Sequence, residues 1–192
     1  MIEVPAAAVM ADVFARHADF LSIGPNDLVQ YAMAIDRTNR ALAYLASPFD
    51  PAILRLISGV VRAGRDFECP VSVCGEMASE PLGALMLLGL GVRELSMEAV
   101  ALPEIKEAIR RVALRELEAV AHKGLELFTA VQVEQLVEMA LAGRLQDILT
   151  GQPDLVPGSG RSPRNHTPAF GMPRITAEQL LSAQSPFLSR SA

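Results

Sequence analysis

Tryptophan is absent from this chain of 192 residues, and both aromatic residues and cysteines are scarce. Aromatic residues make up 5% of the sequence against 51% for all hydrophobic residues, so its core must be aliphatic. The two cysteines, Cys69 and Cys74, flank one short apolar segment, and this spacing disfavours a disulfide between them. They also lack the spacing of a cysteine metal site. A reduced, cytoplasmic setting is therefore expected.

The chain also lacks a block of basic residues and a long hydrophobic run. Its net charge is −5, whereas nucleic-acid binding needs clustered Lys and Arg to neutralise phosphates. The longest apolar stretch, 82–90, contains two glycines and is too short to span a bilayer. The first residues show no basic region followed by an apolar run, so no signal peptide is expected. These features predict neither nucleic-acid binding nor membrane insertion.

Residues 1 to about 115 alternate between apolar strand patterns and helical patterns. The order indicates a parallel sheet with helices outside it, built from about four βα units. Strands are predicted at 2–4, 20–23, 71–74 and 94–97, and helices at 6–16, 28–34, from Pro51 onward, 80–88 and 103–112. Two further helices are expected within 115–143, with Gly143 as a stop or bend.

The composition changes near the end of the chain. Residues 152–173 are rich in Pro, Gly, Ser and Arg and show little periodicity, which is typical of disorder. We therefore expect one domain over 1–145 and a disordered tail over 146–192.

Polar side chains follow or interrupt several predicted strands. Asn26 and Asp27 come after the second strand, within a predicted Gly-Pro turn at 24–27. Taken alone they would more often cap a helix, but an amide and a carboxylate there also suit phosphate and Mg2+. Glu3 lies inside the first apolar strand, where it is either solvated at a frayed terminus or paired with a cation.

Cys74 closes the third predicted strand and is followed by Gly75 and Glu76. A thiol at this position could act as a general acid or as a nucleophile, and the glycine would let a ligand approach closely. Arg37 forms an Asp-Arg pair with Asp36 that is most simply a surface ion pair. Alternatively, its guanidinium could hold a phosphate or carboxylate of a substrate.

The motifs and their order resemble the C-terminal part of the phosphoenolpyruvate-utilising enzymes. The resemblance covers residue 1 to roughly 145. It is closer to the phosphoenolpyruvate–protein phosphotransferases of the sugar phosphotransferase system than to the pyruvate phosphate dikinases and phosphoenolpyruvate synthases. The segments that carry it are MIEVPAA from residue 1, DFLSIG from 19, NDL from 26, QY from 30, AIDR from 34, VCGEMA from 73, LLGLG from 87, ELSM from 94 and IK from 105.

This resemblance implies the second half of a (β/α)8 barrel that binds phosphoenolpyruvate and Mg2+. By motif, Glu3 and Asp27 correspond to the Mg2+ ligands, and Asn26, Asp27 and Arg37 to residues that contact the substrate. Cys74 corresponds to the acid that protonates the enolate of pyruvate. The implied reaction is phosphoryl transfer from phosphoenolpyruvate to a protein histidine.

Four βα units cannot close a barrel, so the resemblance also implies a partner. A homodimer could complete the barrel, as could an N-terminal part that carries the phosphohistidine; a carrier protein of the phosphotransferase system would accept the phosphoryl group. Two alternatives stay open: a non-catalytic remnant that acts as an interaction or dimerisation module, and a fragment of the dikinase or synthase type.

Overall fold

A small parallel sheet lies at the centre of the fold. The structure is a computed structural model that describes residues 1–36, 42 and 45–150, without the side chains of 142, 146, 147, 149 and 150. Its strands, β1 (Leu21–Ile23), β2 (Val71–Cys74) and β3 (Glu94–Ser96), pair in the order β1-β2-β3. The predicted parallel α/β arrangement is therefore confirmed, while the half-barrel stays a prediction.

The first predicted strand is reduced to a single parallel bridge between Ile2 and Ile23. The Ile2 N–H donates to Ser22 O over 2.7 Å, and the Gly24 N–H donates to Ile2 O over 3.0 Å. Because Pro5 begins a helix only three residues after Ile2, the chain leaves the sheet before a second ladder position can form. Even so, the bridge fixes Glu3 beside the end of β1.

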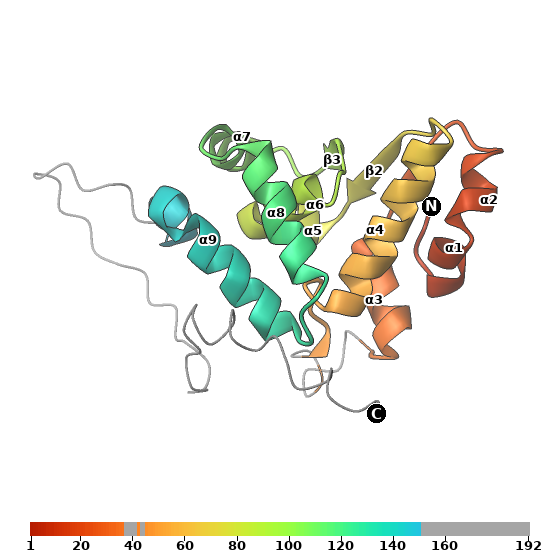
Figure 1. Ribbon diagram of the computed structural model, residues 1–192, viewed down its shortest axis with the longest axis horizontal. Coiled ribbons are helices and arrows are strands. Elements are labelled where there is room, and N and C mark those ends of the chain that lie inside the picture. Colours follow the sequence, from red (N-terminus) through yellow and green to blue (C-terminus); the bar gives the residue numbers. More distant parts are fainter. Residues whose placement is uncertain (37–41, 43–44, 151–192) are drawn as a thin grey trace, which may run out of the picture.

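Helices pack beside the sheet and extend beyond β3 (Figure 1). Before β1 come α1 (Pro5–Val9) and α2 (Ala11–Ala15). Between the strands lie α3 (Pro25–Met33), α4 (Pro51–Asp66), α5 (Glu76–Ser79) and α6 (Pro81–Gly89). After β3 come α7 (Leu102–Arg110), α8 (Leu114–Gly124) and α9 (Ala130–Thr150). No helix within the described residues is long and apolar enough to cross a membrane.

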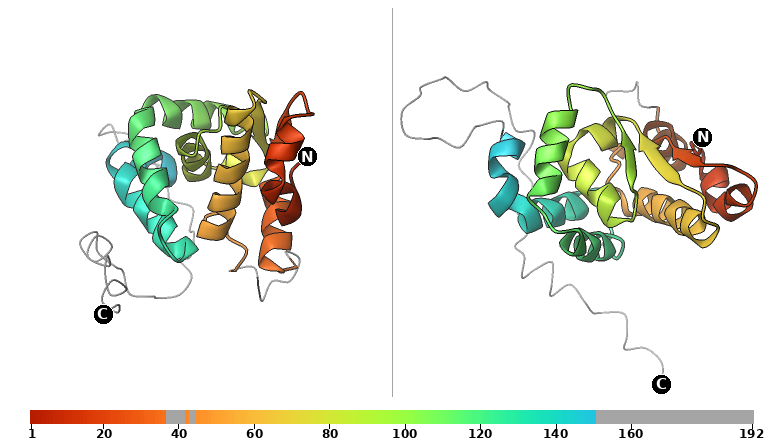
Figure 2. Two further views of the ribbon diagram at one scale, coloured as in Figure 1. Left: turned by 45° about the vertical axis from the view of Figure 1, so that its right-hand side comes forward. Right: turned by 90° about the horizontal axis from the view of Figure 1, so that it is seen from above.

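Helix α4 supplies the central apolar face of the core. Asp50 caps it by accepting a hydrogen bond from the Ala52 N–H over 2.8 Å. Ile53, Ile57 and Val60 recur at helical spacing and are fully buried, as the sequence predicts. The helix packs against β2 and against α1 and α2, which places these helices together in one layer (Figure 2).

Four predicted local features are wrong. The helix predicted over 6–16 is broken at Met10, whose φ of −94° and ψ of 16° separate α1 from α2. The turn predicted at 24–27 is the beginning of α3, because Pro25 is already preset for the first helical position. Helix α5 directly follows β2 and was not predicted, and α9 continues through Gly143 to Thr150.

The C-terminal helices are tied to the rest by arginine contacts. Arg144 of α9 forms a bidentate ion pair with Glu116 of α8. The Arg55 guanidinium of α4 donates two hydrogen bonds to Leu125 O, of 3.0 and 2.6 Å, at the end of α8. Because α9 also packs on α6 and α7, these contacts join the helices after β3 to the sheet layer.

The close packing of α5 against α6 requires a glycine at position 83. A Cβ atom on Gly83 would collide with the Met77 carbonyl, whereas nothing lies within 4 Å of a Cβ atom on Gly59 in α4. We expect Gly83→Ala to lower the free energy of unfolding by about 1–3 kcal/mol, because α6 must shift. Gly59→Ala is the matched control and should raise it by about 0.5–1 kcal/mol, because alanine favours helix. Urea unfolding of both variants measures this; equal effects would contradict the packing.

Candidate site at the carboxyl ends of the strands

The two faces of the sheet differ in chemistry. Ile2, Ile23 and Val73 are 3%, 0% and 0% exposed and belong to the core. Side chains alternate along a strand, so Ser22, Ser72 and Cys74 lie on the opposite face, where they are half-buried. The β3 residues Glu94 and Ser96 are paired with Ser72 and Cys74 and are exposed. This sheet face is therefore polar and partly open to solvent.

Glu3 lies against the beginning of α3. A Cβ atom on Gly24 would lie 2.8 Å from Glu3 Cγ and 2.9 Å from Glu3 Oε1, so the glycine makes room for this carboxylate. Gly24 is the residue before α3, and Asp27 is in the first turn of that helix. The structure thus brings the predicted metal ligands Glu3 and Asp27 to neighbouring strand ends. The alternative that residues 1–4 are a frayed terminus is wrong for Ile2, which is bridged to β1.

Asn26 lies against the turn that follows β2. Gly75 has a φ of 131° and a ψ of −171°, a backbone conformation open almost only to glycine. A Cβ atom there would lie 3.4 Å from Asn26 Oδ1. Gly24 is the N-cap residue of α3 and Asn26 lies within its first turn, so Asn26 is not the helix cap. The Asn26 side chain instead lies where the ends of β1 and β2 meet.

The Cys74 thiol lies between β2 and β1. It donates a hydrogen bond to Ile23 O over 3.6 Å and accepts one from the Ser22 hydroxyl over 3.7 Å. Both cysteines are free, as the sequence predicts, and Cys69 is buried where its thiol donates to Ala18 O. Arg37, predicted to hold the substrate, lies outside the described residues.

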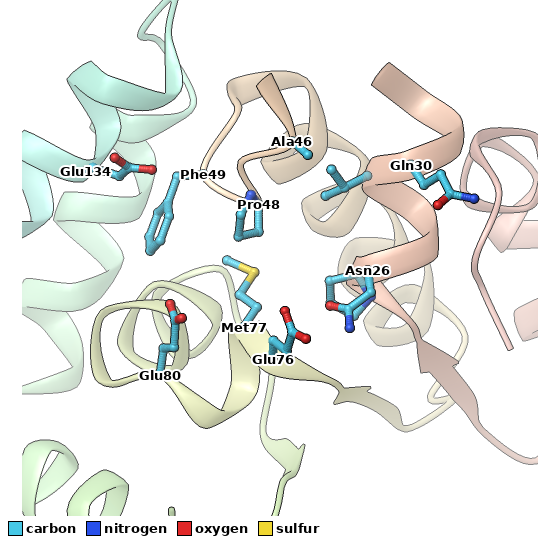
Figure 3. A pocket seen from close by; sticks show the side chains of 11 residues that line it. Asn26, Gln30, Ala46, Pro48, Phe49, Glu76, Met77, Glu80 and Glu134 are labelled. Carbon is cyan, nitrogen blue, oxygen red and sulfur yellow. The ribbon is translucent and has the colours of Figure 1, made fainter. Parts of the chain in front are cut away.

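A cleft of about 480 Å³ opens beside these strand ends (Figure 3). Its lining combines apolar, amide and carboxylate side chains from α3, the segment before α4, α5, the junction between α5 and α6, and α9. The residues are Pro25, Asn26, Val29, Gln30, Ala46, Pro48, Phe49, Glu76, Met77, Glu80 and Glu134. In the view of Figure 3, Glu134 and Phe49 lie toward one end and Asn26 and Gln30 toward the other.

Three carboxylates face this cleft and interact. Burial raises the pKa of Glu80 above its ordinary value, and the negative charges of Glu76 and Glu134 raise it further. Ser47 donates to Glu134 Oε1 over 2.8 Å. Sequence reasoning singled out Glu76 beside Cys74 but missed Glu80 and Glu134, because the packing of α9 against α6, which brings Glu134 to this cleft, is a tertiary effect.

The donor set at the strand ends fits Mg2+ only as a partial site. Carboxylate oxygens such as those of Glu3 and Asp27 are the ligands this hard cation prefers, usually one or two of them with water and substrate oxygens. Among the described residues no cluster of three or more His, Cys, Asp or Glu side chains could hold a metal by itself. A cation here would therefore need further ligands from its substrate.

Comparison with known proteins identifies the relatives of this fold. The model of the PEP-utilising enzyme PEP-binding domain matches residues 1–114, more than half of the chain. The chain belongs to the PEP-utilising enzyme family. Its match takes in both strand ends described above, including Glu3, the 24–27 segment and Cys74.

Similar proteins of this family are much longer than the chain. A multiphosphoryl transfer protein of Xanthomonas campestris pv. campestris is 51% identical over 136 residues, which are 71% of this chain and 16% of that protein. The phosphoenolpyruvate-protein phosphotransferases of Geobacillus stearothermophilus and Mycoplasma pneumoniae are 46% and 44% identical over 138 residues each. Those matches cover 72% of this chain and 24% of each relative, so the chain spans at most about a quarter of their length.

The pKa values of Glu80 and Glu116 are shifted in opposite directions, which gives a test of the electrostatics. The folded-state pKa of Glu80 is raised, so ionising Glu80 opposes folding above that value and has no effect well below 4.5. Glu80→Gln should therefore raise the urea midpoint at pH 7 and leave it unchanged near pH 3.

Glu116 is the control of opposite sign. Its hydrogen bonds with Arg144 lower its pKa to about 2, so its contribution to stability is present above 4.5 and lost as the pH falls toward 2. Glu116→Gln should lower the urea midpoint at pH 7, and less so at high salt because the pair is exposed. A lower midpoint for Glu80→Gln at pH 7 would contradict the repulsion in the cleft.

Proposed function

We propose that this chain supplies the phosphoenolpyruvate and Mg2+ half-site for phosphoryl transfer from phosphoenolpyruvate to a protein histidine. The observation that carries the proposal is the convergence of Glu3, Asn26 and Cys74 at the carboxyl-end edge of a parallel sheet, with Glu3 packed closely against Gly24 and Asn26 beside Gly75. Active sites of parallel α/β proteins form at this edge. Membership of the family supports the choice of substrate.

Each residue has a separate role in this proposal. Glu3 and Asp27 would hold Mg2+, which supplies positive charge to offset the phosphate and the developing enolate. The Asn26 amide would donate to a phosphate oxygen, and the amino end of α3 favours an anion there. Pro25 offers no N–H at that helix end, so the side chains must carry more of the binding. Arg37 would pair with the substrate's negative groups.

Cys74 would act as a general acid. As the bond between phosphorus and the enol oxygen breaks, a bond forms between phosphorus and the histidine nitrogen. The enolate left behind takes the thiol proton on its methylene carbon and becomes pyruvate, and the negative charge moves to sulfur. The position of Cys74 on the open polar face of the sheet supports this role, because substrate can reach that face.

The proposed reaction also needs a phosphoryl-accepting histidine from another part of the protein or from another chain. The polar face bearing Ser22, Ser72 and Cys74 is partly open, although parallel sheets are normally covered on both faces. About three quarters of each similar protein lies outside the part that matches this chain. We propose that a histidine-bearing part like theirs, or a second copy of the chain in a homodimer, completes the site in a cytoplasmic phosphotransferase system.

Calorimetry with phosphoenolpyruvate and Mg2+ tests the half-site directly. Wild type should release heat on binding, alone or mixed with the remaining part of a phosphotransferase. Asp27→Asn should weaken binding about tenfold or more, because one metal ligand loses its charge. Asp12→Asn, at an exposed position of α2, is the matched control and should bind as wild type does.

Two outcomes would overturn the proposal. If wild type gives no heat either alone or in the mixture, the alternative of a non-catalytic interaction module is favoured. If binding occurs but Asp27→Asn and Asp12→Asn bind equally well, the assigned metal position is wrong.

A further inference from the structure

Ser22 lies on the same polar sheet face as Cys74 and reaches its thiol from the neighbouring strand. The Ser22 hydroxyl is 3.7 Å from Cys74 Sγ, and the thiol donates to Ile23 O at 3.6 Å. The proposed reaction leaves Ser22 without a role. We propose that Ser22 is a positioning residue that holds the Cys74 thiol for proton delivery, an inference that rests on the proposed function of Cys74.

The two contacts act on different parts of the thiol. The Ile23 carbonyl accepts a hydrogen bond from the S–H group at rest. The Ser22 hydroxyl donates to sulfur and can keep doing so after the proton has left. At rest the thiol proton therefore points toward Ile23 O. The Ser22 hydroxyl, from the other side, can stabilise the negative charge that develops on sulfur.

Proton transfer from Cys74 to the enolate needs no further reactant. The S–H bond turns away from Ile23 O and breaks, a C–H bond forms at the methylene carbon of the enolate, and the electron pair stays on sulfur. The Ser22 proton remains on its own oxygen and strengthens its hydrogen bond to the thiolate, because hydrogen bonds to charged groups are shorter and stronger. Ser22 thus acts through Cys74 and does not touch the reacting carbon.

The strand pairing does not depend on the Ser22 side chain. Backbone pairing sets β1 against β2, with Leu21 opposite Val71, Ser22 opposite Ser72 and Ile23 opposite Val73. Leu21 and Ile23 supply the buried apolar contacts of β1. Replacement of Ser22 by alanine should therefore leave the sheet in place. Ser72 is the matched control because it is half-buried on the same face, directly opposite Ser22.

Raman spectroscopy of the S–H stretching band tests the contact without any activity. The Cys74 band is obtained by subtracting the spectrum of Cys74→Ser from that of the wild-type chain. We expect the band to shift in Ser22→Ala, because the thiol loses one of its two partners, and to return toward the wild-type position in Ser22→Thr. Ser72→Ala should leave it unchanged. An identical Cys74 band in wild type and Ser22→Ala would overturn the inference.

Exchange of the pyruvate methyl protons in D2O tests the consequence for proton transfer. With Mg2+ present, alone or with the completing part, the wild-type chain should catalyse exchange, which NMR follows as loss of the methyl signal. Ser22→Ala should lower the maximal exchange rate about tenfold with an unchanged KM, since substrate contacts remain. Ser22→Thr should restore the rate, and Ser72→Ala should match wild type.

The outcomes separate this inference from the proposed function. A loss of exchange in Cys74→Ser together with an unaltered rate in Ser22→Ala would overturn the role of Ser22 alone. An absence of exchange in wild type in both settings would overturn the proposed function and, with it, the role of Ser22 in proton delivery.

Discussion

The parallel register of Ile2, β1 and β2 is the constraint on which the candidate site depends. Ile2 is bridged to Ile23, and Ile23 is paired with Val73, so three successive segments end at the same level. The residues immediately after these pairs are therefore neighbours in space although up to 71 residues separate them in the chain, from Glu3 to Cys74. A shift of one residue would turn Cys74 into the core and Val73 onto the polar face.

Two glycines shape the strand ends that this register brings together. Gly24 lets the Glu3 carboxylate lie against the beginning of α3, and Asn26 lies beside Gly75 in the turn after β2. Gly75 also adopts a backbone conformation that costs other residues about 1–3 kcal/mol. The fold therefore favours one arrangement, at the strand ends, of the groups proposed to bind metal and phosphate and to donate a proton. The cleft lined by Glu76, Glu80 and Glu134 adds negative charge beside them.

Local patterns in the sequence predict the elements better than their ends. The apolar spacing of Ile53, Ile57 and Val60 predicts α4, and the run 71–74 predicts β2 within the observed bounds. Met10 carries no signal of a helix break, because the break is set by how α1 and α2 pack on α4. Motif resemblance singled out Glu3, Asn26, Asp27 and Cys74, but the contact between Ser22 and Cys74 follows only from strand register. The contribution of Glu134 likewise depends on where α9 crosses the helices.

Amide chemical shifts test the central claim, that the joined strand ends form a phosphoenolpyruvate and Mg2+ half-site. The measurement is a titration of the 15N-labelled chain with phosphoenolpyruvate and Mg2+, each alone and together. The account predicts shifts concentrated at Glu3, Gly24, Asn26–Asp27 and 74–76, and larger with both ligands than with either one. Shifts confined to residues away from these strand ends, or none with both ligands and the completing part present, would contradict it.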